Sequence, residues 1–170
     1  MLPASDDFSK IPQDPLNPLT TEKVELGKLL FHETGIALAP MQEFAEGTFS
    51  CASCHFAGAG FQAGRFQGIG DGGIGFGING EGRTKGALYQ GDELDVQPIR
   101  SPTIMNGAYQ KNMLWNGQFG ATGLNEGTEA AWTTGTPKEN NFLGFEGLET
   151  QAIAGLGVHR MVMDLSLIHI

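Results

Sequence analysis

The chain has 170 residues, the length of one domain, and 40% of them are hydrophobic while 26 are glycine. This composition predicts a loop-rich domain whose small apolar core is completed by another apolar body, such as a cofactor. The formal net charge of −9 argues against nucleic-acid binding, which needs clustered lysine and arginine. No apolar run approaches the roughly 18 residues of a membrane-spanning helix.

The amino-terminal residues 1–19 are expected to form an extended lead-in, because they hold four of the eight prolines. A helix is predicted over residues 22–31, with Thr20 or Thr21 as its cap. Its apolar face is formed by Val24, Leu26, Leu29, Leu30 and Phe31. Residues 32–48 are expected to be loop.

The most informative motif places His55 directly after the second of two cysteines, Cys51 and Cys54. This spacing is typical of c-type haem attachment. One turn of backbone presents both sulfurs to the two vinyl groups of a porphyrin, and each sulfur forms a thioether. His55 is then placed to bind the iron as proximal ligand. We expect a short helix over residues 48–56 to carry the motif.

Three other interpretations of the two cysteines are weaker. A redox dithiol is expected within a βαβ unit, whereas the surroundings here are rich in glycine. A structural zinc site needs four ligands, and the remaining histidines, His32, His159 and His169, are scattered. A disulfide between the two cysteines would close a very small loop and stabilise little.

A glycine-rich segment follows, with twelve glycines in residues 58–86. This density excludes a helix or a central strand. It allows the backbone to pass close to a flat porphyrin, although a surface loop is the alternative for its outer part. Residues 75–80 match Gly-x-Gly-x-x-Gly, but they lack the strand before and the helix after that dinucleotide binding requires.

The second half of the chain carries two predicted helices separated by loop. The first covers residues 102–109 with Ser101 as cap, and the second covers residues 148–156. Residues 120–141 are expected to be loop. The apolar residues 164–170 carry no terminating signal, so a truncated end is expected there.

Several sequence blocks together resemble the bacterial di-haem cytochrome c peroxidases and their MauG-like relatives. The haem motif is common to all c-type cytochromes, whereas the order and spacing of the other blocks are specific to this family. The blocks are residues 25–31, 49–55, 100–109 and 114–118, followed by 148–152 with 158–161.

The resemblance implies a cytochrome c-like haem domain, mostly α with long Gly-rich loops, over residues 20–163. In the family two such domains each carry one covalently bound haem c, and the amino-terminal haem is peroxidatic. The chain matches that amino-terminal half, so a second haem is expected on a domain absent from this sequence. The lead-in 1–19 and the end 164–170 flank the haem domain.

Three positions depart from the family pattern. Asp71 stands where relatives carry a distal histidine, sixteen residues after the proximal one, which favours an open or water-bound iron. Arg160 replaces a glutamate that assists peroxide cleavage in relatives. Arg100 replaces an asparagine that helps bind calcium, which argues against calcium here.

The resemblance also suggests catalytic roles. Trp115 resembles a tryptophan that passes electrons between the two haems, although an aromatic residue can simply pack. Arg160 is a candidate to stabilise the leaving hydroxide, and His159 or Asp71 to carry the proton. The alternative for these charged residues is an ordinary surface position. Met161 packs on the porphyrin or binds the iron.

The function expected from the resemblance is reduction of hydrogen peroxide to water, with electrons from a small cytochrome c or a cupredoxin. One alternative is a mono-haem electron-transfer cytochrome whose sixth ligand is a methionine, and another is a MauG-like oxidase of a protein partner. The candidate methionines are Met105, Met113, Met161 and Met163.

Covalent haem is attached outside the cytoplasmic membrane, so a periplasmic location is expected, with the export signal missing from this chain. A homodimer is compatible with the resemblance. The isolated domain is expected to be inactive in steady-state turnover, because the electron-accepting haem is missing.

Overall fold

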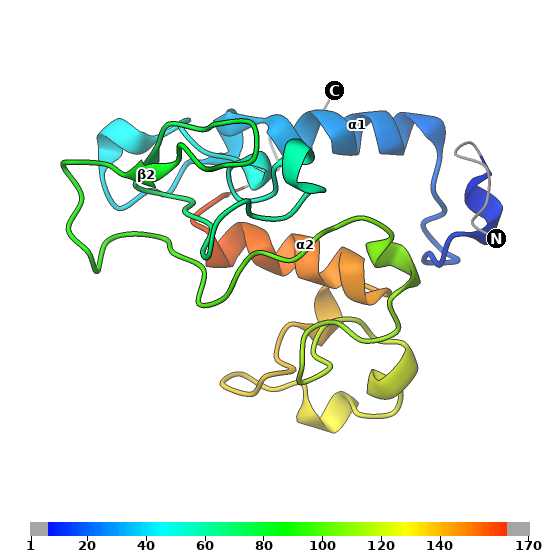
Figure 1. Cartoon of the computed structure of the whole chain (residues 1–170). Helices are drawn as coiled ribbons and strands as arrows, with labels where there is room; N and C mark the ends of the chain where they lie inside the picture. Colours follow the sequence, from blue (N-terminus) through cyan, green and yellow to red (C-terminus); the bar gives the residue numbers. More distant parts are fainter. Residues whose placement is uncertain (1–6, 163–170) are drawn as a thin grey trace. The chain divides into compact units, whose positions relative to one another are not determined.

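The computed structural model describes residues 7–162, and Figure 1 shows the course of the chain. The chain divides into two compact units. One unit contains residues 1–26 and 106–155, and the other contains residues 27–105 and 156–170. The described residues of each unit are treated below on their own.

The described chain contains two α-helices, one small antiparallel hairpin and several short 3-10 helices (Figure 1). Helix α1 covers Thr21–His32 and α2 covers Gly147–Val158, which confirms both predicted helices. Strand β1, Gly73–Ile74, pairs antiparallel with β2, Thr84–Lys85. Short 3-10 helices cover Phe8–Lys10, Thr34–Ile36, Glu43–Ala45, Cys51–Ser53, Ala57–Ala59, Gly107–Tyr109, Gly123–Asn125, Glu129–Ala131 and Asn141–Leu143.

The described residues are mostly loop, and they do not show the mostly α-helical character that was expected. The long glycine-rich loops are present. The regular structure in the segments predicted as loops consists of 3-10 helices of three residues each. Glycine loses more conformational freedom in a helix than any other residue, so a segment this rich in glycine closes through isolated turns instead.

Helix α1 begins at the cap that the sequence predicts. The Lys23 backbone N–H donates to the Thr20 hydroxyl over 3.3 Å, so Thr20 is the cap of the two candidates. None of the residues in α1 is buried, and Leu29 remains 71% exposed. The described chain therefore covers the predicted apolar face only in part: Leu26 and Leu29 are exposed, whereas Val24, Leu30 and Phe31 are half-buried.

Replacing Thr20 with alanine should lower the free energy of unfolding by about 1 kcal/mol, because it removes the acceptor for one helix N–H. Urea unfolding of the haem-loaded chain measures this loss. Thr21→Ala is the matched control, and equal losses in the two variants would contradict the assignment of the cap.

The predicted helix over residues 102–109 is wrong except for its last turn. Residues 101–104 form no regular structure, and their backbone bonds to the loop that follows the haem motif. Ala63 N–H donates to the Ser101 carbonyl over 3.2 Å, and Ile104 N–H donates to the Phe61 carbonyl over 3.3 Å. These contacts between distant segments override the local helix signals.

The glycine-rich segment closes around the buried side chain of Arg83, which is 1% exposed. Its guanidinium donates to the carbonyls of Ile69, at 2.5 Å, and Gly70, at 2.7 Å. A Cβ at Gly73 would lie 2.7 Å from Arg83 Nε, so glycine is needed for this approach. Residues 75–80 lie between β1 and β2, so a strand and not a helix follows them.

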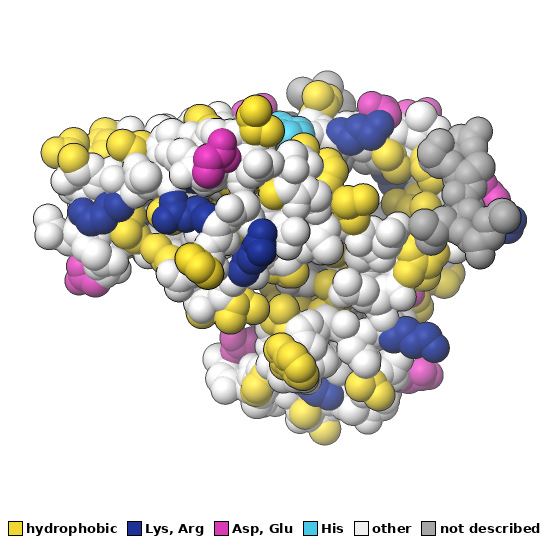
Figure 2. Space-filling model, in the orientation of Figure 1, with side chains coloured by type: hydrophobic (Ala, Val, Ile, Leu, Met, Phe, Trp, Pro, Cys, Tyr) yellow, Lys and Arg dark blue, Asp and Glu magenta, His cyan; other side chains and the backbone are white. Residues whose placement is uncertain are grey.

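The unit of residues 27–105 and 156–170 has a small apolar core. It consists of Ile36, Ala37, Phe49 and Met161, with Cys51 and Leu156 packed at its edge. Many large apolar side chains of the described chain are exposed, and Figure 2 shows apolar patches on one face. A core this small agrees with the expectation that another apolar body completes it.

In the unit that contains residues 106–155, two buried asparagine side chains form hydrogen bonds to the backbone of the loops. Asn141 accepts a hydrogen bond from Phe119 N–H over 2.8 Å, and Asn125 donates to the carbonyls of Gly117 and Phe119. Both asparagines are nearly fully buried. Buried polar groups of this kind stabilise a loop only when they are hydrogen-bonded.

Candidate haem-attachment site

Both cysteines and the following histidine lie on one tight turn. Ser50 N–H donates to the Ser53 hydroxyl over 3.0 Å and starts the 3-10 helix Cys51–Ser53. The Cys51 carbonyl then accepts from the N–H groups of Cys54 and His55, over 3.2 and 3.1 Å. The helix is shorter than predicted, but it gathers the three side chains as expected.

His55 is oriented as a metal-binding imidazole. Its Nδ1–H donates to the Phe61 carbonyl over 3.0 Å, and the Pro102 carbonyl is a second backbone partner of the ring. A metal bound by this ring would use Nε2, the nitrogen that does not bond to Phe61. Burial lowers the pKa of His55 and so favours the neutral form that binds metals. Phe61 adopts a left-handed φ of 56°, and its own N–H bonds to the Phe56 carbonyl over 2.8 Å.

The two cysteines are free and carry neutral thiols. Burial raises the pKa of Cys51, and burial followed by the charge of Asp95 raises the pKa of Cys54 to about 12. A redox dithiol needs a lowered thiol pKa, so this environment disfavours that interpretation. The described residues contain no group of three or more metal-binding side chains, which gives no support to a zinc site.

The folded, haem-free chain should alkylate slowly at Cys54. A thiol with a pKa near 12 has roughly a thousandth of the thiolate of an ordinary cysteine at pH 8. Labelling with iodoacetamide, followed by mass spectrometry, measures the rate, and the same chain in urea gives the unfolded reference. Circular dichroism checks that the sample is folded, and equal rates in a folded sample would contradict the prediction.

The surroundings of Cys54 fit a covalently attached porphyrin. A Cβ at Gly68 would lie 2.9 Å from the Cys54 sulfur and 2.6 Å from the Ser101 hydroxyl. That hydroxyl is buried without a hydrogen-bond partner in the described chain. Two free thiols, one oriented imidazole and a small apolar core together match the needs of haem c.

Asp71 and Arg160, two of the predicted site residues, form an ion pair. Arg160 Nη1 lies 2.6 Å from Asp71 Oδ2. The Asp71 carboxylate is fully buried and also accepts from Met41 N–H, at 2.8 Å, and from the Tyr89 hydroxyl, at 2.5 Å. The carboxylate accepts hydrogen bonds from three donors, and these donors lie on three segments that are far apart in the sequence.

His159, the third predicted residue, pairs with a different carboxylate. Its Nδ1 lies 3.0 Å from Asp95 Oδ2. The Gln97 amide nitrogen lies 3.1 Å from the same ring nitrogen. Sequence reasoning missed Asp95, Gln97 and Tyr89, because no local motif marks them and their partners lie far away in sequence.

Trp115 belongs to the other unit and is fully exposed. Its relation to the haem motif therefore stays a prediction. Met161 is 6% exposed within the core, in agreement with packing, while Met105 is 55% exposed. Met163 lies outside the described residues. Arg100 donates to the Ala63 carbonyl over 2.6 Å.

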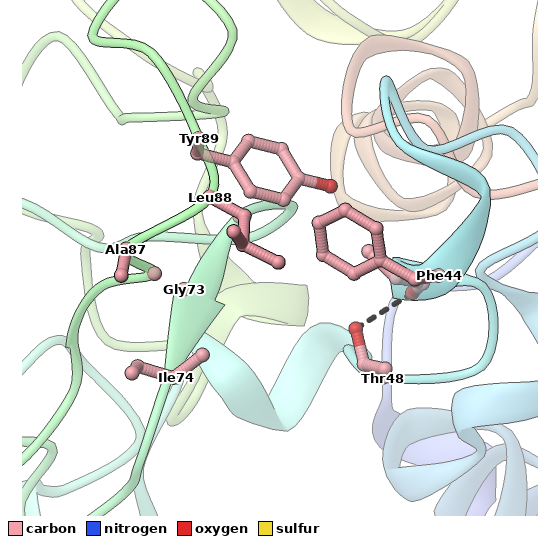
Figure 3. A pocket seen from close by; sticks show the side chains of 10 residues that line it. Phe44, Thr48, Gly73, Ile74, Ala87, Leu88 and Tyr89 are labelled. Carbon is pink, nitrogen blue, oxygen red and sulfur yellow. Dashed lines mark hydrogen bonds between the residues drawn. The ribbon is translucent and has the colours of Figure 1, made fainter.

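An apolar pocket of about 270 Å³ lies beside the Asp71 cluster (Figure 3). The rings of Phe44 and Tyr89 meet edge to face, with centroids 5.7 Å apart, and Leu88 lies next to them. The Thr48 hydroxyl donates to the Ala45 carbonyl, and the Tyr89 hydroxyl is bound by Asp71. Both hydroxyl hydrogens are therefore used within the protein, and the other labelled side chains of the pocket are apolar.

The haem motif, the oriented imidazole and the loop-rich fold define a c-type haem protein. A family model described as di-haem cytochrome c peroxidase matches residues 21–162. The chain belongs to this family.

One curated relative, the cytochrome c peroxidase Ccp of Escherichia coli (strain K12), is 30% identical over 101 residues. The match covers 59% of this chain and 16% of that protein. No solved structure matches the chain. Among the described residues, no helix has the length and apolar character to cross a membrane.

Proposed function

We propose that the chain is a peroxidatic haem domain that reduces hydrogen peroxide to water in the periplasm. The electrons come from a small cytochrome c or a cupredoxin. Membership of the peroxidase family supports the reaction class. One observation carries the proposal: the Arg160 guanidinium contacts Asp71 through Nη1 and not through its other two nitrogens.

A haem held by Cys51, Cys54 and His55 would supply an iron for peroxide and the two electrons that the reduction needs. Two protons are also needed to convert one peroxide molecule into two waters. Arg160 keeps Nε and Nη2 without partners in the described chain, and its side chain is 26% exposed. These donors can stabilise negative charge on the departing oxygen.

Asp71 acts in this proposal as a positioning residue rather than as a proton carrier. Its carboxylate is buried and accepts three hydrogen bonds, so it holds Arg160 in place. His159 is partly exposed and remains the proton carrier. Trp115 passes electrons from the second haem.

The test is the single-turnover reaction of the haem-loaded chain with peroxide, followed by absorbance. Arg160→Gln should slow the reaction by about 100-fold, because it removes a charged donor from the reacting oxygen. Arg65→Gln is the matched control and should leave the rate unchanged. A ferric spectrum that is low-spin and insensitive to both peroxide and cyanide would contradict the proposal and favour an electron carrier.

A further inference from the structure

Tyr89 is a buried phenol that the proposed function does not use. The residue is 2% exposed, and its hydroxyl donates to Asp71 Oδ1 over 2.5 Å. Burial, followed by the hydrogen bond to Asp71, raises the pKa of Tyr89, so the phenol keeps its proton at neutral pH. The structure therefore holds a neutral tyrosine with a carboxylate directly at its proton.

The two oxygens of the Asp71 carboxylate have separate partners. Oδ1 accepts from the Tyr89 hydroxyl, whereas Oδ2 accepts from Met41 N–H over 2.8 Å and from Arg160 Nη1 over 2.6 Å. A proton that moved from Tyr89 to Oδ1 would leave both contacts of Oδ2 in place, because the second oxygen of a neutral carboxyl group still accepts hydrogen bonds. Oδ1 is thus positioned to take the phenol proton without rearrangement of the cluster.

The ring of Tyr89 lies in apolar surroundings. The Phe44 ring meets it edge to face, with centroids 5.7 Å apart (Figure 3). A Cβ at Gly72 would lie 2.6 Å from Tyr89 Cδ1 and 2.7 Å from Leu94 Cδ2, so the backbone closes tightly on the other side. A ring enclosed in this way is shielded from water and from small reductants in solution.

The chain keeps Tyr89 near the haem-attachment turn. A Cβ at Gly68 would lie 2.9 Å from the Cys54 sulfur, and Gly72 packs against the Tyr89 ring. The four residues from 68 to 72 span at most about 14 Å even when fully extended. A haem attached at Cys54 would therefore be close enough to this ring for electron transfer through the protein.

A second connection leads through Arg160 to the other haem anchor. Arg160 donates to Asp71, and the next residue, Met161, packs in the core cluster that has Cys51 at its edge. In the proposed function Arg160 acts on the departing oxygen of peroxide. Tyr89 is therefore joined, through Asp71, to the residue that acts on peroxide.

We propose that Tyr89 is a redox-active tyrosine that gives one electron to the haem after peroxide has been reduced. The inference rests on the proposed function, which leaves the haem two electrons short at that point. As the electron leaves the phenol, its O–H bond breaks and the proton passes to Asp71 Oδ1, which leaves a neutral tyrosyl radical and a neutral carboxyl group. An electron from the small redox protein and the proton on Asp71 then restore the phenol. This proton stays within the cluster, so His159 remains the carrier for the protons that peroxide consumes.

The first test is electron paramagnetic resonance of the haem-loaded chain, frozen at set times after mixing with peroxide. The chain contains two tyrosines, Tyr89 and Tyr109, so ring-deuterated tyrosine narrows the signal if the radical is a tyrosyl. The signal should be lost in Tyr89→Phe and kept in the matched control Tyr109→Phe. A protein that reacts with peroxide but keeps its radical in Tyr89→Phe, or carries it on a tryptophan, would overturn the inference.

A photochemically generated ruthenium(III) oxidant tests Tyr89 without peroxide. In the haem-loaded Tyr109→Phe protein, a laser flash should produce the absorbance of a tyrosyl radical at Tyr89. Adding Asp71→Asn should slow its formation by about 100-fold, because a positioned base is lost, and Asp92→Asn should leave the rate unchanged. Equal rates with Asp71→Asn and Asp92→Asn, or no radical after the flash, would overturn the inference. A protein that forms the radical after the flash but does not react with peroxide would contradict the proposed function alone.

Discussion

Replacing His55 with alanine is expected to leave the haem tethered but to remove its axial nitrogen ligand. The His55 ring is oriented by the Phe61 carbonyl at 3.0 Å, and burial favours its neutral form. Loss of an orienting partner alone typically costs 10–100-fold in metal affinity or activity, so loss of the ligand should slow the peroxide reaction by at least about 100-fold.

Absorbance and electron paramagnetic resonance spectra of the ferric protein measure the change in ligation. Added imidazole should restore the wild-type spectrum, because it supplies the missing nitrogen. His32→Ala is the matched control, since His32 lies at the end of α1 and is exposed. A His55→Ala protein with the wild-type spectrum would show that another residue binds the iron.

Replacing Asp71 with alanine should lower the free energy of unfolding by about 3 kcal/mol. The substitution leaves the buried Tyr89 hydroxyl and the Met41 N–H without their acceptor, and it removes the partner of Arg160. Each unsatisfied buried group costs about 1–3 kcal/mol, and breaking a buried ion pair costs more than an exposed pair. The partial exposure of Arg160 limits the total.

Urea unfolding of the haem-loaded protein measures this effect. Asp92→Ala is the matched control, because Asp92 is exposed, and it should change stability by less than about 0.5 kcal/mol. Asp71→Asn should lose less than Asp71→Ala, since an amide oxygen still accepts hydrogen bonds. Equal stability of the Asp71→Ala and Asp92→Ala proteins would contradict the role of Asp71 as a structural anchor.

Local signals in the sequence were sufficient to predict the tight turn of the haem motif and the two α-helices. Cys51, Cys54 and His55 lie within one turn, so their spacing alone determines which side chains meet. Helices α1 and α2 follow from caps and apolar patterns that act within a few residues.

Contacts between distant segments could not be predicted in the same way. Arg160 meets Asp71 across 89 positions, and His159 meets Asp95 across 64. A helix was predicted from residue 102, but residues 101–104 do not form one because their backbone bonds to the loop after the haem motif. The resemblance singled out His159, Arg160 and Asp71, but only the folded chain shows that Arg160 contacts Asp71 and that His159 contacts Asp95.

The most direct test of the central claim is the mass of the purified chain after denaturation and acid–acetone extraction. The chain should be produced with its haem-attachment machinery in the periplasm. A haem bound through Cys51 and Cys54 should stay with the polypeptide and add the mass of one haem, and the double variant Cys51→Ser/Cys54→Ser should lack it. A wild-type chain that releases all of its haem into the organic phase, or that carries none, would contradict the account.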